Sequence, residues 1–145
     1  HTYIIGEHGD SEVAAWSITN IAGMSMKSFF EHYGKCTDED LQAMYSEVKN
    51  SAYEIIQKKG ATYYAIAAAV ARIVECISGG ENSVLTISSV LNGEYGIEDI
   101  SLSVPTQVSG YGVERILDVP FNEIELQGLR NSAKTLKDSL KSIGF

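Results

Sequence analysis

Apolar positions recur with helical spacing in the middle of this chain. The side chains at positions 41, 44, 45, 48, 52, 55 and 56 fall on one face of a helix. Thr37 is a suitable N-cap, and the acidic residues that follow it suit the positive end of the helix dipole. Lys58, Lys59 and Gly60 form a matching stop signal. The pattern therefore predicts an amphipathic helix between Thr37 and Gly60.

Two further helices differ in how their apolar residues are distributed. Residues 62–78 are apolar on nearly every face and rich in alanine, so we expect this helix to be buried and closely packed. Near the end of the chain, Asn122 and Glu125 have the spacing of a capping box. An apolar stripe follows them from Leu126 to Ile143, which predicts the last helix.

Strands are predicted where apolar residues alternate or form short runs. Alternation is clearest at 100–109, and residues 1–5, 13–21 and 84–91 also have strand character. Glycines near position 111 can turn the chain back through 113–119 as a hairpin. Because helices and antiparallel strands occur in separate groups, the predicted fold class is α+β, with mostly antiparallel strands and hairpins packed with three main helices.

Charge and composition narrow the classes of partner. The net charge is −8 and the chain has only three arginines, so nucleic acid is not an expected partner. The longest apolar stretch, 61–77, contains Arg72, and we predict no membrane span. Cys36 and Cys76 lack the spacing of metal ligands. We expect both to be reduced thiols in a cytoplasmic protein.

The candidate chemistry lies in residues 6–11, which read Gly-Glu-His-Gly-Asp-Ser between two apolar strands. Glycines on both sides allow a tight turn that can present His8 to a cleft, where an imidazole can donate or accept a proton near neutral pH. One alternative is a solvated loop histidine without chemistry. A metal site built from His1, Glu7, His8 and Asp10 is a second alternative, but adjacent Glu7 and His8 would point apart in extended chain, and we predict no metal.

The loop and four other segments resemble bacterial L-lactate dehydrogenases. The similar segments are 3–11, 14–17, 52–65, 103–106 and 110–113, and the resemblance runs along the whole chain. It implies that residues 1–145 are the C-terminal substrate-binding and catalytic domain, a little under half of a complete family member. The dinucleotide-binding domain is then expected upstream of this chain. Malate dehydrogenases usually differ at Glu7, which favours the lactate branch.

The resemblance also implies roles for four residues. His8 matches the proton donor and acceptor of the family. Thr62 would contact the substrate, although it also suits the N-cap of the alanine-rich helix. Ile66 would pack on the nicotinamide ring, with ordinary core packing as the alternative. His1 matches a residue that binds a phosphate of fructose 1,6-bisphosphate in allosterically activated members, or it is only a histidine at the start of a strand.

By the same resemblance, the activity is NAD-dependent, reversible reduction of pyruvate to L-lactate in glycolysis and fermentation. The expected assembly is a homotetramer or homodimer. Tyr53 matches a tyrosine that is modified in some relatives, although an unmodified aromatic on a helix face is the simpler interpretation. The alternatives are a sibling L-2-hydroxyacid or malate dehydrogenase, or a non-catalytic assembly module of the same fold.

The first residue is His and already has strand character, so we interpret the chain as part of a longer polypeptide. Gly110 and Gly112 are not a dinucleotide fingerprint, because the third glycine is missing and a strand follows. We therefore expect that this chain alone neither binds NAD tightly nor turns over pyruvate. We also expect apolar surface to be exposed where other parts of the protein dock, with the alanine-rich helix as the candidate.

Overall fold

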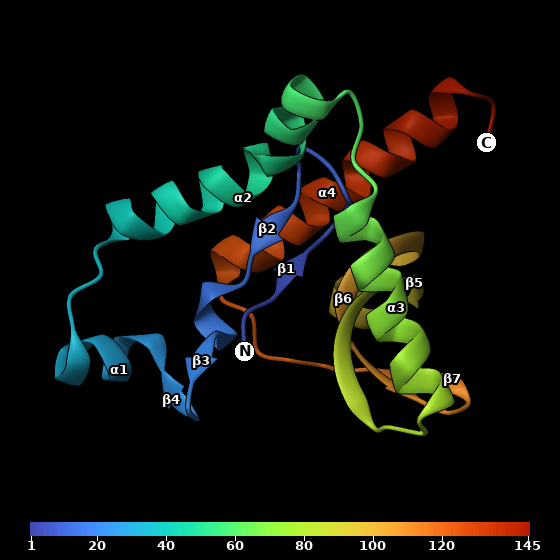
Figure 1. The fold of residues 1–145 in the computed structure, drawn as a ribbon. Helices are drawn as coiled ribbons and strands as arrows, with labels where there is room; N and C mark the ends of the chain where they lie inside the picture. Colours follow the sequence, from blue (N-terminus) through green and yellow to red (C-terminus); the bar gives the residue numbers. More distant parts are fainter.

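A three-stranded antiparallel sheet organises the computed structural model, which describes residues 1–145 (Figure 1). The strands are β5 (Ser83–Asn92), β6 (Glu98–Ser109) and β7 (Gly112–Ile116), in the order β5-β6-β7. The strand predicted at 100–109 is confirmed, and its alternation holds as far as Val104, since Ile100, Leu102 and Val104 are buried while Ser101 is exposed. Beyond Val104 the alternation fails, because Thr106 and Ser109 are buried as well as Val108. The hairpin predicted around Tyr111 is also present, although its second strand ends at Ile116 and not at Val119.

Two short hairpins precede the sheet. β1 (Ile4–Ile5) pairs with β2 (Val13–Ala14), and β3 (Asn20–Ile21) pairs with β4 (Met24–Ser25). The first predicted strand is thus shorter than 1–5, and the single strand predicted over 13–21 is wrong.

A 3₁₀ turn, η1 (Trp16–Ile18), breaks the predicted strand 13–21 in two. At this turn the backbone N–H and the hydroxyl of Ser17 both donate to the Glu125 carboxylate, which lies at the start of the last helix. In a strand, the backbone N–H of Ser17 would donate to a neighbouring strand; here it donates to Glu125 of α4 instead.

Four helices complete the fold, so the predicted α+β class is confirmed. They are α1 (Met26–Tyr33), α2 (Asp38–Lys59), α3 (Tyr64–Ser78) and α4 (Glu123–Ser142), and a 3₁₀ turn η2 (Glu94–Gly96) links β5 to β6. The sequence pattern did not predict α1. The N-caps predicted at Thr37 and Asn122 are confirmed, and each is part of a capping box, with Asp40 and Glu125 respectively. Gly60 ends α2 in the left-handed conformation.

The hydrophobic core lies between the sheet, the first hairpin and α4. Its fully buried members include Ile5, Leu91, Leu102, Val104 and Leu129. The loop between β1 and β2 therefore leaves directly from the core, which gives the residues of that loop a fixed base.

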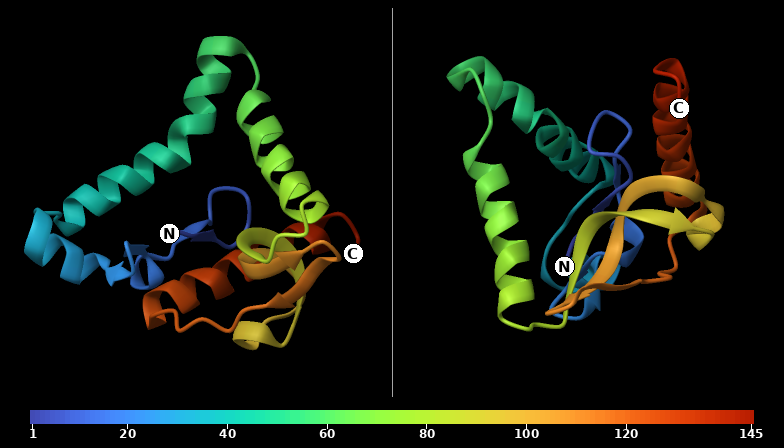
Figure 2. Two further views of the ribbon diagram at one scale, coloured as in Figure 1. Left: turned by 60° about the horizontal axis from the view of Figure 1, so that its bottom comes forward. Right: turned by 90° about the vertical axis from the view of Figure 1, so that its right-hand side faces the viewer.

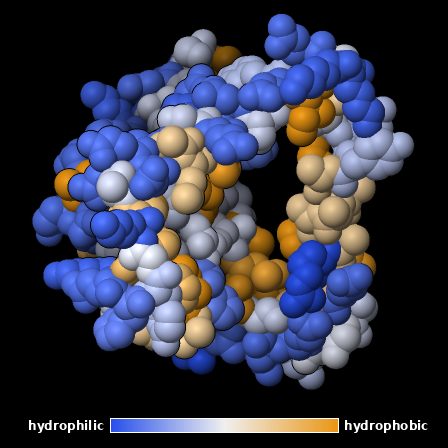
Figure 3. Space-filling model, turned by 60° about the vertical axis from the view of Figure 1, so that its left-hand side comes forward, coloured by the Kyte–Doolittle hydropathy of each residue, from blue (hydrophilic) through white to orange (hydrophobic).

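By contrast, α2 and α3 stand away from this core (Figure 2). No residue of α2 is buried, and Cys76 is the only buried residue of α3. The expectation that residues 62–78 are buried within this chain is wrong: Ile66, Val70 and Val74 are each more than half exposed, at 53%, 53% and 55%. Figure 3 shows apolar atoms bordering an opening through the molecule. The second expectation, an exposed apolar surface on the alanine-rich helix, is confirmed.

None of the helices is both long enough and apolar enough to cross a membrane.

Candidate active site

The glycine-containing loop 6–12 connects β1 to β2 and is fixed at its start by the central sheet. Gly6 forms an isolated antiparallel bridge with Ser103 of β6, with N···O distances of 2.9 and 2.8 Å in the two directions. The φ angle of Gly6 is +100°, and a Cβ atom at this position would lie 2.8 Å from the hydroxyl oxygen of Ser132. Only glycine meets both conditions without strain.

A second set of hydrogen bonds ties the loop to α4 through Ser132. The Glu7 N–H donates to the Ser132 hydroxyl oxygen at 2.6 Å, and the Ser11 hydroxyl lies 3.1 Å from the same oxygen. The Glu7 carboxylate in turn accepts hydrogen bonds from the N–H and hydroxyl of Ser11, at 2.9 and 2.6 Å. Ser132 itself is fully buried. The carboxylate of Glu7 thus closes the loop on itself, and Gly6 to Ser11 has a defined shape.

His8 lies at the exposed tip of this loop and lines a cavity of about 400 Å³. The other lining residues are Ile4, Glu7, Glu12, Thr86 and Ser103. The loop points into the space framed by α2 and α3 (left view of Figure 2). An imidazole in this position can exchange a proton with a ligand that enters the cavity.

Glu12 immediately precedes β2, and the sequence pattern did not identify it as a candidate site residue. One of its carboxylate oxygens, Oε1, is buried without a hydrogen-bond partner. Burial raises the pKa of Glu12, while the positive charges of His8 and Lys49 lower it. The only signal in the sequence is a carboxylate four residues after His8, a spacing that has no meaning until the loop geometry is known.

Helix α2 packs against the back of the loop through polar contacts. The Tyr45 hydroxyl donates to the backbone oxygen of Glu12, and the Lys49 ammonium donates to the backbone oxygen of Asp10. The Tyr53 hydroxyl lies 3.4 Å from the Asp10 carboxylate, so this exposed aromatic also faces the loop. These contacts hold the far side of the loop where the Ser132 contacts do not reach.

The other two residues predicted near the reacting groups lie on the α2–α3 side. Thr62 is in the connection between the helices and is partly buried, and Ile66 is in the first turn of α3. The N-cap prediction for Thr62 is wrong: the cap position is Tyr63, and no side chain caps the helix. Core packing of Ile66 is also wrong for this chain, since its side chain is exposed. Neither residue lines the His8 cavity.

His1 lies in a separate cavity of about 400 Å³, together with Tyr3, Asn20, Arg72 and Ser83. Its backbone pairs with Asn20, and its exposed ring is free of hydrogen bonds to the rest of the chain. Arg72 forms two hydrogen bonds to the Glu81 carboxylate, at 3.2 and 2.6 Å, so its charge is already paired. The structure therefore brings His1 close to one arginine that is engaged elsewhere.

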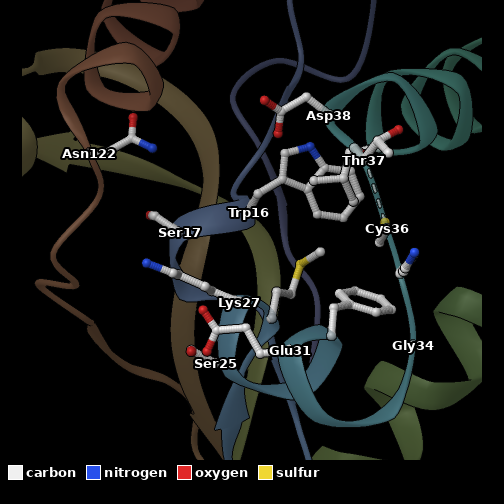
Figure 4. A pocket seen from close by; sticks show the side chains of 14 residues that line it. Trp16, Ser17, Ser25, Lys27, Glu31, Gly34, Cys36, Thr37, Asp38 and Asn122 are labelled. Carbon is white, nitrogen blue, oxygen red and sulfur yellow. Dashed lines mark hydrogen bonds between the residues drawn. The ribbon is translucent and has the colours of Figure 1, made fainter.

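A larger cavity, of about 760 Å³, lies between η1 and the connection from α1 to α2, away from every predicted site residue. Trp16, Cys36 and Asp38 border it (Figure 4). Cys36 and Cys76 are both free thiols. No group of three or more His, Cys, Asp or Glu side chains is arranged to hold a metal ion, and His1, Glu7, His8 and Asp10 form no such group.

Comparison with known proteins finds one family along nearly the whole chain. Residues 1–144 match the family model described as lactate/malate dehydrogenase, alpha/beta C-terminal domain. The chain is 56% identical over 144 residues to the L-lactate dehydrogenase of Acetivibrio thermocellus, and 56% identical over 144 residues to L-lactate dehydrogenase 1 of Clostridium acetobutylicum. Each match covers 99% of this chain, but only 45% and 46% of these relatives.

Solved structures give the same result for the fold. The minor L-lactate dehydrogenase from Enterococcus mundtii, in its ligands-bound form, superposes with a TM-score of 0.92 at 44% identity, covering 99% of this chain and 46% of that one. The malate dehydrogenase from Archaeoglobus fulgidus in complex with NADH superposes with a TM-score of 0.84 at 32% identity, covering 100% and 44%. The chain thus spans less than half the length of the relatives it matches.

Proposed function

The chain belongs to the lactate/malate dehydrogenase family, as its alpha/beta C-terminal domain, and from this premise we propose that it is the substrate-side domain of an NAD-dependent L-lactate dehydrogenase. The observation that carries the proposal is the placement of His8, in a loop held by Ser103 and Ser132, beside a cavity that a small molecule can enter. We assign this activity to a cytoplasmic polypeptide of the relatives' full length, of which this chain matches less than half.

In the proposed reaction, His8 handles the proton. When pyruvate is reduced, negative charge develops on its carbonyl oxygen, and protonated His8 donates a hydrogen bond to that oxygen and then transfers the proton. In the reverse direction, neutral His8 accepts the proton from the hydroxyl of lactate. A charge-assisted hydrogen bond of this kind contributes roughly 1.5–3 kcal/mol even before any further stabilisation of the transition state.

The residues of this chain suit the nicotinamide end of NADH, but not its pyrophosphate. NADH supplies the hydride when bound, and the exposed apolar face of α3 around Ile66 suits a nicotinamide ring. The turn at Gly110 and Gly112 does not suit the pyrophosphate, because it leads into β7 and not into a helix N-terminus. The dinucleotide is therefore held mainly by residues outside this chain, and this chain alone does not turn over pyruvate.

Three further roles complete the proposal. Thr62 contacts the substrate, and Ile66 packs on the nicotinamide. His1 binds a phosphate of fructose 1,6-bisphosphate at a subunit interface of a homotetramer or homodimer. The support for His1 is its exposed ring in a cavity with Asn20 and Arg72, although Arg72 is paired with Glu81 and does not supply a free cation.

Steady-state kinetics of the full-length protein test the proposal. With NADH present, we expect pyruvate to be preferred over oxaloacetate and over branched 2-keto acids. The His8→Ala variant should lose roughly 10²–10⁴-fold in kcat for pyruvate, because proton transfer is removed, while NADH affinity changes little. His32→Ala, an exposed histidine on α1, is the matched control and should keep the wild-type rate. Full activity of His8→Ala would overturn the assignment.

A sibling L-2-hydroxyacid or malate dehydrogenase is the second candidate, favoured by the similarity to the Archaeoglobus fulgidus enzyme. A preference for oxaloacetate in the same kinetic comparison would select it. Absence of turnover with every 2-keto acid would instead favour a non-catalytic assembly module.

A further inference from the structure

Ser132 is a fully buried polar residue of α4 whose hydroxyl bonds to the loop 6–12 and not to its own helix. The Glu7 N–H donates to the Ser132 oxygen at 2.6 Å, and the Ser11 hydroxyl oxygen lies 3.1 Å from it. By contrast, the hydroxyls of Thr135 and Ser139 on the same helix donate to backbone oxygens four residues earlier. The fold therefore directs one buried hydroxyl of α4 to the loop that carries His8.

The polar groups of Glu7, Ser11 and Ser132 satisfy one another in a closed ring of hydrogen bonds. The Ser11 hydroxyl has a single hydrogen, which it donates to the Glu7 carboxylate at 2.6 Å, the shorter of its two contacts. The Ser132 hydrogen is then available to the Ser11 oxygen, while the Ser132 oxygen accepts from the Glu7 N–H. Loss of either hydroxyl breaks the ring and leaves another of its groups without a partner.

The ring holds the chain on both sides of His8. Glu7 is fixed at its N–H by Ser132, and Ser11 is fixed at its N–H by the Glu7 carboxylate, with an N···O distance of 2.9 Å. A Cβ atom added at Gly9 would lie 3.3 Å from a Glu7 carboxylate oxygen, so the carboxylate lies against the backbone just beyond His8. The backbone of His8 makes no hydrogen bond of its own, so its position follows from these neighbours.

The contacts from α2 reach a different part of the loop. The side chains of α2 bond to the backbone and carboxylate oxygens of Asp10 and to the backbone oxygen of Glu12, all after His8 in sequence. The residue directly before His8 is fixed by α4 through Ser132. The two helices therefore hold the loop at separate points.

We propose that Ser132 and Ser11 are positioning residues for proton transfer by His8, and that they act through Glu7. The inference rests on the proposed role of His8 in the reaction. Neither serine lines the cavity beside His8, so any effect on turnover passes through the conformation of the loop. Proton transfer requires its two heavy atoms within hydrogen-bond reach, and a displacement of about 1 Å can cost on the order of 10²-fold in rate.

The kinetic test uses Ser132→Ala and Ser11→Ala in the full-length protein. We expect each to lower kcat for pyruvate by about 10–100-fold, because the backbone before His8 is released. KM for NADH should change by less than about twofold, because neither serine touches the cofactor. Ser11 is only partly buried, so Ser11→Ala tests the ring even if Ser132→Ala does not fold. Ser11→Thr keeps a hydroxyl and should recover most of the kcat that Ser11→Ala loses.

Amide hydrogen exchange of the same variants gives a readout that needs no turnover. The Glu7 N–H loses its acceptor in Ser132→Ala and should exchange about 10-fold faster, the size of effect expected for the loss of one hydrogen bond. Amides paired between β5 and β6 should keep their wild-type exchange rates, because the change in the loop is local.

Thr106→Val is the matched control. It also removes a buried hydroxyl, but one that donates to the backbone oxygen of Val104 in the sheet. It should lower Tm while leaving kcat and the exchange of the Glu7 N–H near wild type. Equal losses of kcat in Thr106→Val and Ser132→Ala would overturn the inference, as would wild-type kcat in either alanine variant or a loss of kcat in Ser132→Ala without faster exchange at Glu7. Failure of the dehydrogenase proposal would show separately, as no turnover by the unaltered protein, while the exchange at Glu7 still reports on the ring.

Discussion

At the scale of single residues, Gly6 combines a left-handed backbone with a close approach to Ser132. We expect Gly6→Ala to destabilise the protein by roughly 2–3 kcal/mol, because the added methyl group meets the Ser132 hydroxyl oxygen while the backbone is strained. Gly60→Ala is the control: its φ is +87°, but no atom lies within 4 Å of the added Cβ, so it should cost only about 1 kcal/mol. Denaturant titration of the two variants measures the difference, and equal losses would contradict a clash at Ser132.

Residues that act through chemistry were easier to predict from the sequence than residues that act through position. His8 stood out because a histidine between glycines is unusual and imidazole titrates near neutral pH. Ser132 did not stand out, since a serine in an amphipathic helix has no distinguishing pattern. Its contact with Glu7 joins positions separated by 125 residues, and only the fold brings them together. Glu12 was missed for the same reason.

At the scale of elements, Glu125 links the start of α4 to η1. Its buried carboxylate accepts hydrogen bonds from the N–H of Asn122 and from both polar groups of Ser17. We expect Glu125→Ala to destabilise the protein by roughly 2–3 kcal/mol, because it removes a charged acceptor that the donors of Ser17 and Asn122 share and breaks the capping box of α4. Glu123→Ala removes an exposed carboxylate from the same helical turn and should cost about 0.5 kcal/mol. Unfolding curves of both variants test this, and a similar small cost for both would show that Ser17 finds other partners.

Local sequence signals predicted the elements whose ends are fixed by neighbouring residues. The capping boxes at Thr37 and Asn122 and the stop at Gly60 were all confirmed, because each is made within one turn of chain. Strand 13–21 failed where Ser17 bonds to a residue 108 positions away. Helix α1 was missed because it has only eight residues, which is too short for a clear periodic pattern.

At the scale of the whole molecule, the apolar pattern predicted which surfaces must be covered but not what covers them. The alanine-rich α3 has the composition of a buried helix, yet within this chain only its Cys76 is buried, next to the end of β6. The spacing of apolar residues shows which face of a helix is stabilised by burial, but it does not identify the apolar surface that covers this face. The same holds for α2, whose predicted stripe includes Met44, Val48 and Ile56, all substantially exposed.

This surface leads to a prediction about association of the 145-residue chain in solution. Each exposed valine or isoleucine on α3 leaves apolar surface in water. When another chain covers this surface, the association is stabilised by about 25 cal/mol per Å² of apolar area buried. We therefore expect the chain to self-associate with rising concentration in sedimentation velocity experiments. Val74→Lys, which places a charge in the middle of this face, should weaken the association at least several-fold.

Ile124→Lys is the matched control for that prediction. Ile124 is 84% exposed on α4, away from α3, so its replacement also removes an exposed apolar side chain but not one on the α3 face. It should leave the association unchanged, because an isolated apolar side chain does not form an interface. If both lysine variants weakened association equally, general loss of hydrophobicity would explain the result. If the unaltered chain stayed monomeric throughout, the face of α3 would not drive association by itself.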